Sequence, residues 1–65
     1  MIIHVYDNEV NLHTISNAMG LAYHKANNEM SIVFEDIAGE ADHVTFNMND
    51  VNYLVIEESY NESAD

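Results

Sequence analysis

Residues 51–58 read Val-Asn-Tyr-Leu-Val-Ile-Glu-Glu, and this stretch decides which fold the rest of the chain can adopt. Because successive side chains of a strand point to opposite faces, Val51, Tyr53 and Val55 would share one face of it. The stretch then ends in two carboxylates. It combines the two features that this chain has in quantity, β-forming apolar residues and negative charge, and we expect it to be the last strand of a sheet.

Three earlier stretches alternate in the same way between two faces, at residues 2–6, 30–35 and 43–48. This period of two predicts strands. The Asn-Asp pair that follows residue 48 suits a tight turn, and residues 37–42 form a glycine-containing connection. We therefore expect the last three strands to form an antiparallel meander, with the first strand of the chain paired to it.

Between residues 11 and 27 the apolar period changes from two to three or four, which predicts an amphipathic helix. The side chains that would form its apolar stripe are Leu12, Ile15, Met19, Ala22, Tyr23 and Ala26. Asn27 and Asn28 would supply a left-handed stop at its end. A second interpretation makes residues 10–12 a short strand and begins the helix near Thr14.

The resulting element order, β-α-β-β-β, predicts an α+β fold in which one helix covers one face of a small antiparallel sheet. Residues 1–58 would form this single domain, and residues 59–65 would fray as an acidic tail because they have little to bury. On the uncovered face, apolar side chains could be ordinary surface residues or could contact a second copy, and we expect a homodimer. The side chains concerned are Ile2, Tyr6, Val33, Leu54 and Ile56.

The charge balance is extreme, with twelve Asp and Glu residues against a single basic residue, Lys25, and a net charge of −11. Solubility needs a net charge of only about 2 to 8. Disorder is a poor explanation outside the tail, because 48% of the residues are apolar and many of them alternate. The imbalance therefore points to a basic partner.

No pattern in the sequence is typical of a catalytic or metal centre, and we expect no enzyme activity, no metal and no cofactor. There is no Cys, and the spacing of the histidines favours surface or packing roles for His4, His13, His24 and His43. Residues 36–42 place three acids around a glycine but lack the ligand spacing of an EF-hand, which favours a solvated acidic turn. Glu57 and Glu58 would point to opposite faces of a strand and form no acid–base pair.

The first residues, Met-Ile-Ile-His-Val, have neither the basic segment nor the long apolar core of a signal peptide. No apolar run approaches the roughly 20 residues of a membrane span. The absence of Cys also fits a reducing compartment. We therefore expect a soluble, cytoplasmic protein without membrane contacts.

A single Lys excludes direct nucleic-acid binding, since a phosphate backbone is recognised by Lys and Arg. The reverse relationship stays open. A globule of this length is about 28 Å across, a distance over which duplex DNA displays about 16 negative charges. Twelve carboxylates approach this density, and a basic protein could bind them as it binds phosphates. The acids that we assign to such a partner-binding face are Glu35, Asp36, Glu40, Asp42, Asp50, Glu57, Glu58 and Glu62.

In type, the chain resembles the small acidic inhibitors, called DNA mimics, that bacteriophages make against host DNA-binding proteins. The residues that carry the resemblance are Glu35, Asp36, Glu40, Asp42, Glu57, Glu58 and Glu62. The resemblance implies competitive blockade of a basic DNA-binding site in the host cytoplasm. A symmetric dimer would suit the nucleoid-associated protein HU, which is the favoured target.

Two other classes of function would use the same charge. An antitoxin or anti-sigma-like regulator would bind a basic partner without imitating DNA, and it would need an apolar anchor such as Ile56 or Tyr60. A structural domain from a halophile would also be acidic and poor in Lys, and it would unfold at low salt.

Overall fold

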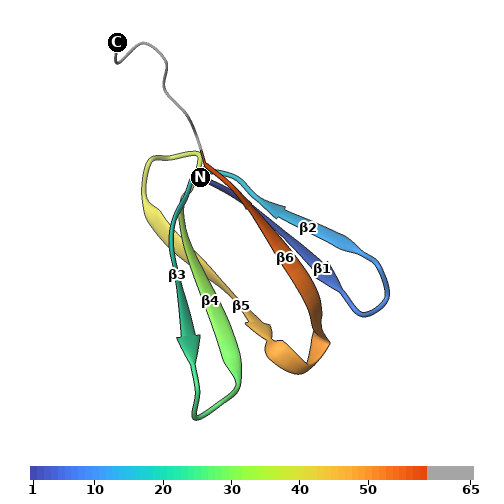
Figure 1. The fold of residues 1–65 in the computed structure, drawn as a ribbon. Coiled ribbons are helices and arrows are strands. Elements are labelled where there is room, and N and C mark those ends of the chain that lie inside the picture. Colours follow the sequence, from blue (N-terminus) through green and yellow to red (C-terminus); the bar gives the residue numbers. More distant parts are fainter. Residues whose placement is uncertain (59–65) are drawn as a thin grey trace.

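The structure, a computed structural model, describes residues 1–58, which form β-strands joined by turns and one short 3-10 turn (Figure 1). In chain order the elements are β1 (Ile2–Asp7), β2 (Leu12–Ile15), β3 (Ala18–His24), β4 (Glu29–Glu35), β5 (Ala41–Asn47), the 3-10 turn η1 (Met48–Asp50) and β6 (Val51–Glu57). The described part of the chain is therefore all-β.

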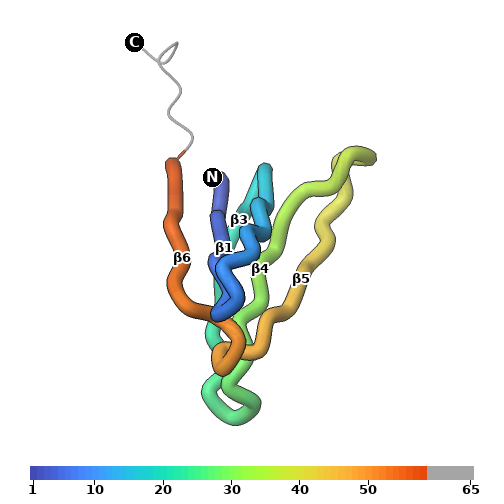
Figure 2. The backbone as a smooth tube through the Cα atoms, turned by 90° about the vertical axis from the view of Figure 1, so that its right-hand side faces the viewer, coloured from blue at the N-terminus to red at the C-terminus, as the bar shows by residue number. Residues whose placement is uncertain are grey.

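The strands form two antiparallel three-stranded sheets, with the orders β2-β1-β6 and β3-β4-β5. β3, β4 and β5 follow one another as a meander, whereas β6 leaves this sheet through η1 and returns to pair with β1, with Ile2 opposite Glu57 and Val5 opposite Leu54. Figure 2 shows β6 and β5 on opposite sides of the molecule. The last strand thus pairs with the first, although almost the whole described chain separates them in sequence.

The two central strands supply the buried core. Ile3 and Val5 of β1 cluster with Met30 and Ile32 of β4, and these four side chains are almost completely buried. Each such side chain contributes roughly 1.5–3 kcal/mol by leaving water. The flanking strands are much more exposed, and the molecule measures 41 × 23 × 20 Å, longer than the expected globule because each sheet has only three strands.

Two of the hairpins close with the same arrangement of hydrogen bonds. Oδ1 of Asp7 accepts hydrogen bonds from the backbone N–H groups two and four residues further along the chain, each at 2.9 Å. Oδ1 of Asp36 makes the same pair at the same distances. The third residue after each Asp has a positive φ, 66° at Val10 and 82° at Gly39. A short acidic side chain therefore holds both turns.

Asparagine side chains link the two sheets at the opposite end from the chain start. The backbone N–H of Met48 donates to the carbonyl of Asn28 at 2.8 Å, and Nδ2 of Asn28 donates to Oδ1 of Asn49 at 3.0 Å. Nδ2 of Asn8 donates to the carbonyl of Asn49 at 2.7 Å. η1 is thereby bound to a turn from each sheet, which accounts for part of the Asn content of the sequence.

The predicted helix over residues 11–27, and with it the α+β fold, is wrong. These residues form β2, a two-residue connection and β3, and the alternative that began a helix near Thr14 is wrong as well. The positive φ of Asn17 and a register shift between Ala18 and Gly20 each change the phase of the strand pattern. These two interruptions produce the three- and four-residue apolar spacing that imitated a helix.

The other predicted strands are confirmed, since β1, β4, β5 and β6 cover the expected stretches to within two residues. The expected pairing of β6 with β5 is wrong, because β6 pairs with β1. Within residues 1–58 no helix covers a sheet face. The side chains assigned to one uncovered face are therefore divided: Leu54 packs against the core, while Val33 lies on the outer face of β4. The homodimer stays a prediction, and the acidic tail predicted at residues 59–65 lies outside the described residues.

Candidate functional site

Six of the assigned acids lie at one end of the molecule, which we call the acidic end. They are Glu35, Asp36, Glu40, Asp42, Glu57 and Glu58. The backbone brings their strands together there, because Glu57 pairs with Ile2, the Met1 carbonyl accepts from Ala18 N–H at 2.9 Å, and the adjacent Asn17 carbonyl accepts from Glu35 N–H at 3.0 Å. Figure 1 shows the β4–β5 turn and the end of β6 at this same end.

The acidic end has two separate groups of carboxylates. Figure 2 shows the β4–β5 turn and the end of β6 on opposite sides, with β1 between them. Within the turn group, Glu35 lies on the outer face of its sheet, whereas Asp42 is paired with Phe34 on the inner face. The acids therefore surround the end of the molecule and do not form one flat face.

Two of the assigned acids are elsewhere. Asp50 lies in η1 at the opposite end, where its backbone carbonyl accepts a hydrogen bond from Asn8 at 3.1 Å. Its neighbours there include Asp7 and Glu9, which line the same hollow. Glu62 lies outside the described residues.

The acids of the acidic end differ in whether their side chains already make hydrogen bonds or ion pairs within the protein. Asp36 holds its turn, Oδ1 of Asp42 accepts from the N–H of His43 at 2.7 Å, and Glu57 binds Nε2 of His4 at 2.5 Å. Within residues 1–58, the side chains of Glu35, Glu40 and Glu58 make no hydrogen bond or ion pair. These last three are exposed and are available to a partner.

Ile37, at the tip of the β4–β5 turn, is a fully exposed apolar side chain among the acids. Its neighbours in sequence are Asp36 and Ala38, in a turn that Gly39 completes with its positive φ. Strand alternation does not single out this residue, because it lies in a connection. The signal that could have found it is an Ile inside a glycine-containing acidic turn, where nothing can bury it.

A groove runs between β2 of one sheet and β5 of the other. Its larger part has a volume of about 800 Å³ and contacts both strands, the β2–β3 connection and the β4–β5 turn. Its apolar lining consists of Ile15, Phe34, Ile37, Val44 and Phe46. A second hollow of about 510 Å³ shares His13 and Phe46 with the first and extends towards Asp7 and Asp50. We call the two together the β2–β5 groove.

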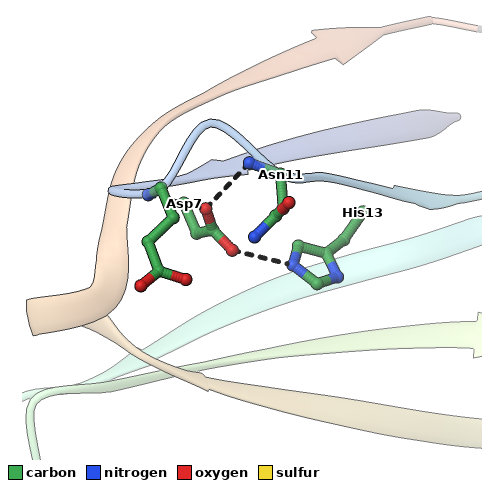
Figure 3. A network of polar contacts seen from close by, with 4 residues as sticks. Asp7, Asn11 and His13 are labelled. Carbon is green, nitrogen blue, oxygen red and sulfur yellow. Dashed lines mark hydrogen bonds and ion pairs between the residues drawn. The ribbon is translucent and has the colours of Figure 1, made fainter.

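His13 lies at the junction of the two hollows. Its ring stands edge-on to the ring of Phe46, with the centroids 5.5 Å apart, and its Nε2 lies 3.3 Å from Oδ2 of Asp7. Figure 3 shows the Asp7 carboxylate between His13 and the N–H of Asn11. The hydrogen bond from Asn11 N–H, followed by that from His13, holds the pKa of Asp7 below its ordinary value of 3.8.

The groove could not be foreseen from a helix over residues 11–27, because the groove is formed by a strand there. In a strand over residues 12–15 the side chains alternate between two faces. His13 and Ile15 lie on the same face as their partners Val5 and Ile3, which is the core face of the sheet. Val44 and Phe46 of the neighbouring sheet pack against the same core. The strand assignment of β2 was therefore the missing step.

Within residues 1–58, no group of three or more His, Asp or Glu side chains is placed to hold a metal ion. No helix in this described part is long and apolar enough to cross a membrane. Comparisons of the chain with protein-family models, with curated protein sequences and with solved structures found no match.

Proposed function

We propose that this protein is a DNA mimic that binds the basic DNA-binding surface of another protein through its acidic end and so inhibits DNA binding. A nucleoid-associated protein such as HU is the first candidate for the target. The observation that carries the proposal is the gathering of six carboxylates, from three strands and a turn, at one end of a chain whose net charge is −11.

The exposure of these carboxylates supports a role in binding. No charged side chain is buried in the described part, and Glu35, Glu40, Asp42, Glu57 and Glu58 are all exposed. Mutual repulsion of so many like charges costs stability, which no fold-supporting contact of Glu35, Glu40 or Glu58 offsets. A partner rich in Lys and Arg would remove this cost on binding.

The shape limits how much of a duplex the protein can imitate. Along 41 Å, duplex DNA displays about 24 charges at one per roughly 1.7 Å, whereas the described residues carry ten carboxylates. The density is duplex-like only where the acids gather. We therefore propose that the acidic end substitutes for a short run of phosphates, and that a partner contacts it on both sides of β1.

The test is competition between this protein and DNA for purified HU. The protein should displace a labelled duplex from HU, and the displacement should weaken steeply between about 0.05 and 0.2 M salt because the ion pairs are screened together. A pull-down from a bacterial lysate, with DNA added to a parallel sample, would identify another target if HU is not bound.

Neutralisation of matched sets of acids locates the site. Glu35→Gln, Glu40→Gln and Asp42→Asn together should weaken binding roughly tenfold to a hundredfold, because three exposed ion pairs are lost. Adding Glu57→Gln and Glu58→Gln should abolish it. The control for the first, three-residue set removes three charges from outside the acidic end, by Glu9→Gln, Glu29→Gln and Asp50→Asn. If this control weakens binding equally, or if the partner stays bound when DNA is added, the proposed mimicry is wrong.

A further inference from the structure

We propose that the β2–β5 groove binds an extended, basic peptide segment of a partner protein, which lies along β2 and inserts one large apolar side chain between the sheets. The proposal goes beyond the acidic end, since it assigns a second, apolar contact surface and a kind of ligand to it. It does not require the partner to be a DNA-binding protein.

Both walls of the groove are edge strands. Within residues 1–58, β2 pairs only with β1, and β5 pairs only with β4. Three consecutive residues of β2, His13, Thr14 and Ile15, line the larger hollow together with the β2–β3 connection, so that the backbone edge of β2, and not merely one face, borders it. An exposed edge presents unpaired N–H and C=O groups, which an extended peptide can pair with as an additional strand.

The floor of the groove is apolar and continuous with the core. Ile15, Val44 and Phe46 are only partly buried, yet all three pack against the core cluster of Ile3 and Ile32. The volume of about 800 Å³ lies within the usual range of roughly 300–1,000 Å³ for ligand sites. The apolar surface that the two sheets leave uncovered here is therefore large enough for a Leu, Ile or Phe side chain.

The ends of the groove define the charge of the occupant. Glu35 and Asp36 line one end, and Asp7, Glu9 and Asp50 line the other. Neither hollow is lined by Lys or Arg, since Lys25 lies in the β3–β4 turn. A peptide with Lys or Arg on both sides of its apolar residue would match this pattern.

A second copy of this chain is a poor occupant of the groove. It would carry a net charge of −11 to an acidic rim, and like charges brought together at an interface are strongly unfavourable. It has one Lys to offset this charge. The charge of the groove thus favours a basic partner over self-association at this surface.

A synthetic peptide tests the proposal directly. The probe is a fluorescein-labelled nine-residue peptide with a central Leu flanked by Lys at alternate positions, measured by fluorescence anisotropy in 0.15 M salt with the full chain. The control peptide has the same charge and Ser in place of Leu. Because burial of a Leu side chain contributes to binding, the Leu peptide should bind at least about tenfold more tightly.

Variants of the protein locate the binding surface. Ile37→Ser changes a fully exposed groove residue and should leave the fold intact. It should weaken the binding of the Leu peptide about fivefold. Phe46→Leu should weaken it as well. The matched control is Val55→Ser, which changes an exposed residue on the outer face of β6 and should have no effect.

Backbone pairing has its own readout. In ¹⁵N-¹H spectra the peptide should shift the amide signals of residues 12–17. N-methylation of every second peptide residue should weaken binding only when the methylated N–H groups are those that face β2. The rings of Tyr6 and Tyr53 stack on the outer face of β1 and β6, away from the groove. Equal binding of the Leu and Ser peptides, no binding of either, or shifts centred on these two residues would overturn the proposal. These outcomes are independent of competition with DNA, so either proposal can fail while the other stands.

Discussion

Val10 occupies in the β1–β2 turn the position that Gly39 occupies in the β4–β5 turn. Both follow an Asp by three residues, both donate a backbone N–H to the carbonyl of that Asp, and both have a positive φ. Glycine adopts this conformation without steric cost, whereas a β-branched residue is strained in it. The same turn is therefore relaxed in one hairpin and strained in the other.

Replacing Val10 by Gly should stabilise the protein by about 1 kcal/mol. The substitution relieves backbone strain, which exceeds the entropy that a Gly adds to the unfolded chain. Little packing is lost, because Val10 is 79% exposed. Urea denaturation followed by circular dichroism would measure the change. Gly39→Val, placed where no atom would contact its Cβ, should cost roughly 1–2 kcal/mol, and stabilisation by it would contradict this explanation.

The turn that Asp7 holds should weaken in acid. The N–H of Asn11 stabilises the charged carboxylate and lowers its pKa in the folded state. The resulting stability is fully present above the unfolded pKa of about 3.8 and is lost as the pH falls through the lower folded value. Between about pH 5 and pH 2, the urea midpoint should therefore fall more for the unsubstituted protein than for Asp7→Asn.

A neighbouring carboxylate provides the control for this pH dependence. Glu9→Gln removes a charge from the same turn but keeps the backbone N–H that donates to Asp7. Its midpoint should follow the unsubstituted protein through the acid range. A parallel loss of the pH dependence in both variants would assign it to the general negative charge and not to Asp7.

The asparagine link between the sheets should contribute measurably to stability. Asn49→Ala removes the hydrogen bond from Nδ2 of Asn28 and should cost about 0.5–1.5 kcal/mol. Asn52→Ala, in the exposed part of β6, should have almost no effect, because no side-chain hydrogen bond is lost within residues 1–58. Equal effects of the two substitutions would show that the link is not stabilising.

The two faces of β4 should respond very differently to truncation. Ile32 is completely buried, and Ile32→Ala should cost roughly 2–5 kcal/mol through lost burial and the cavity that remains. A small domain has only about 5 kcal/mol of stability, so this variant should be largely unfolded at 37 °C. Val33, the next residue, is 37% exposed, and Val33→Ala should cost less than about 1 kcal/mol. Thermal unfolding of both variants would check this contrast.

The sequence was sufficient where one strand alternates without interruption. Met30 and Ile32 alternate with Ser31 and Val33 in a stretch predicted to be a strand, and the structure buries the first pair. It was insufficient where Asn17 and the register shift before Gly20 divide the pattern, because periodicity cannot distinguish two phase-shifted strands from a helix. Gly20 and the β-branched Thr14 and Ile15 were the local signals against a helix.

The acidic site was partly predictable for a related reason. Glu35, Asp36, Glu40 and Asp42 are close in sequence around one turn, so any hairpin brings them together. Their proximity to Glu57 depends on which strand β6 pairs with, and hydrophobic alternation carries no information about strand partners. Asp50 was assigned to the same surface, but the crossover through η1 places it at the far end.

The pairing of β1 with β6 also determines when the protein can fold. Ile2 and Glu57 are 55 positions apart, so a nascent chain must carry its first strand without a partner on that edge until β6 leaves the ribosome. Until then, of the two sheets in residues 1–58, only the meander of β3, β4 and β5 is complete, and Ile3 and Val5 have just one neighbouring strand. Folding that waits for such distant contacts takes roughly milliseconds to seconds, and the waiting intermediate exposes an edge and apolar side chains to aggregation. The high negative charge keeps these unfinished chains apart, a benefit that begins during synthesis, before any partner is met.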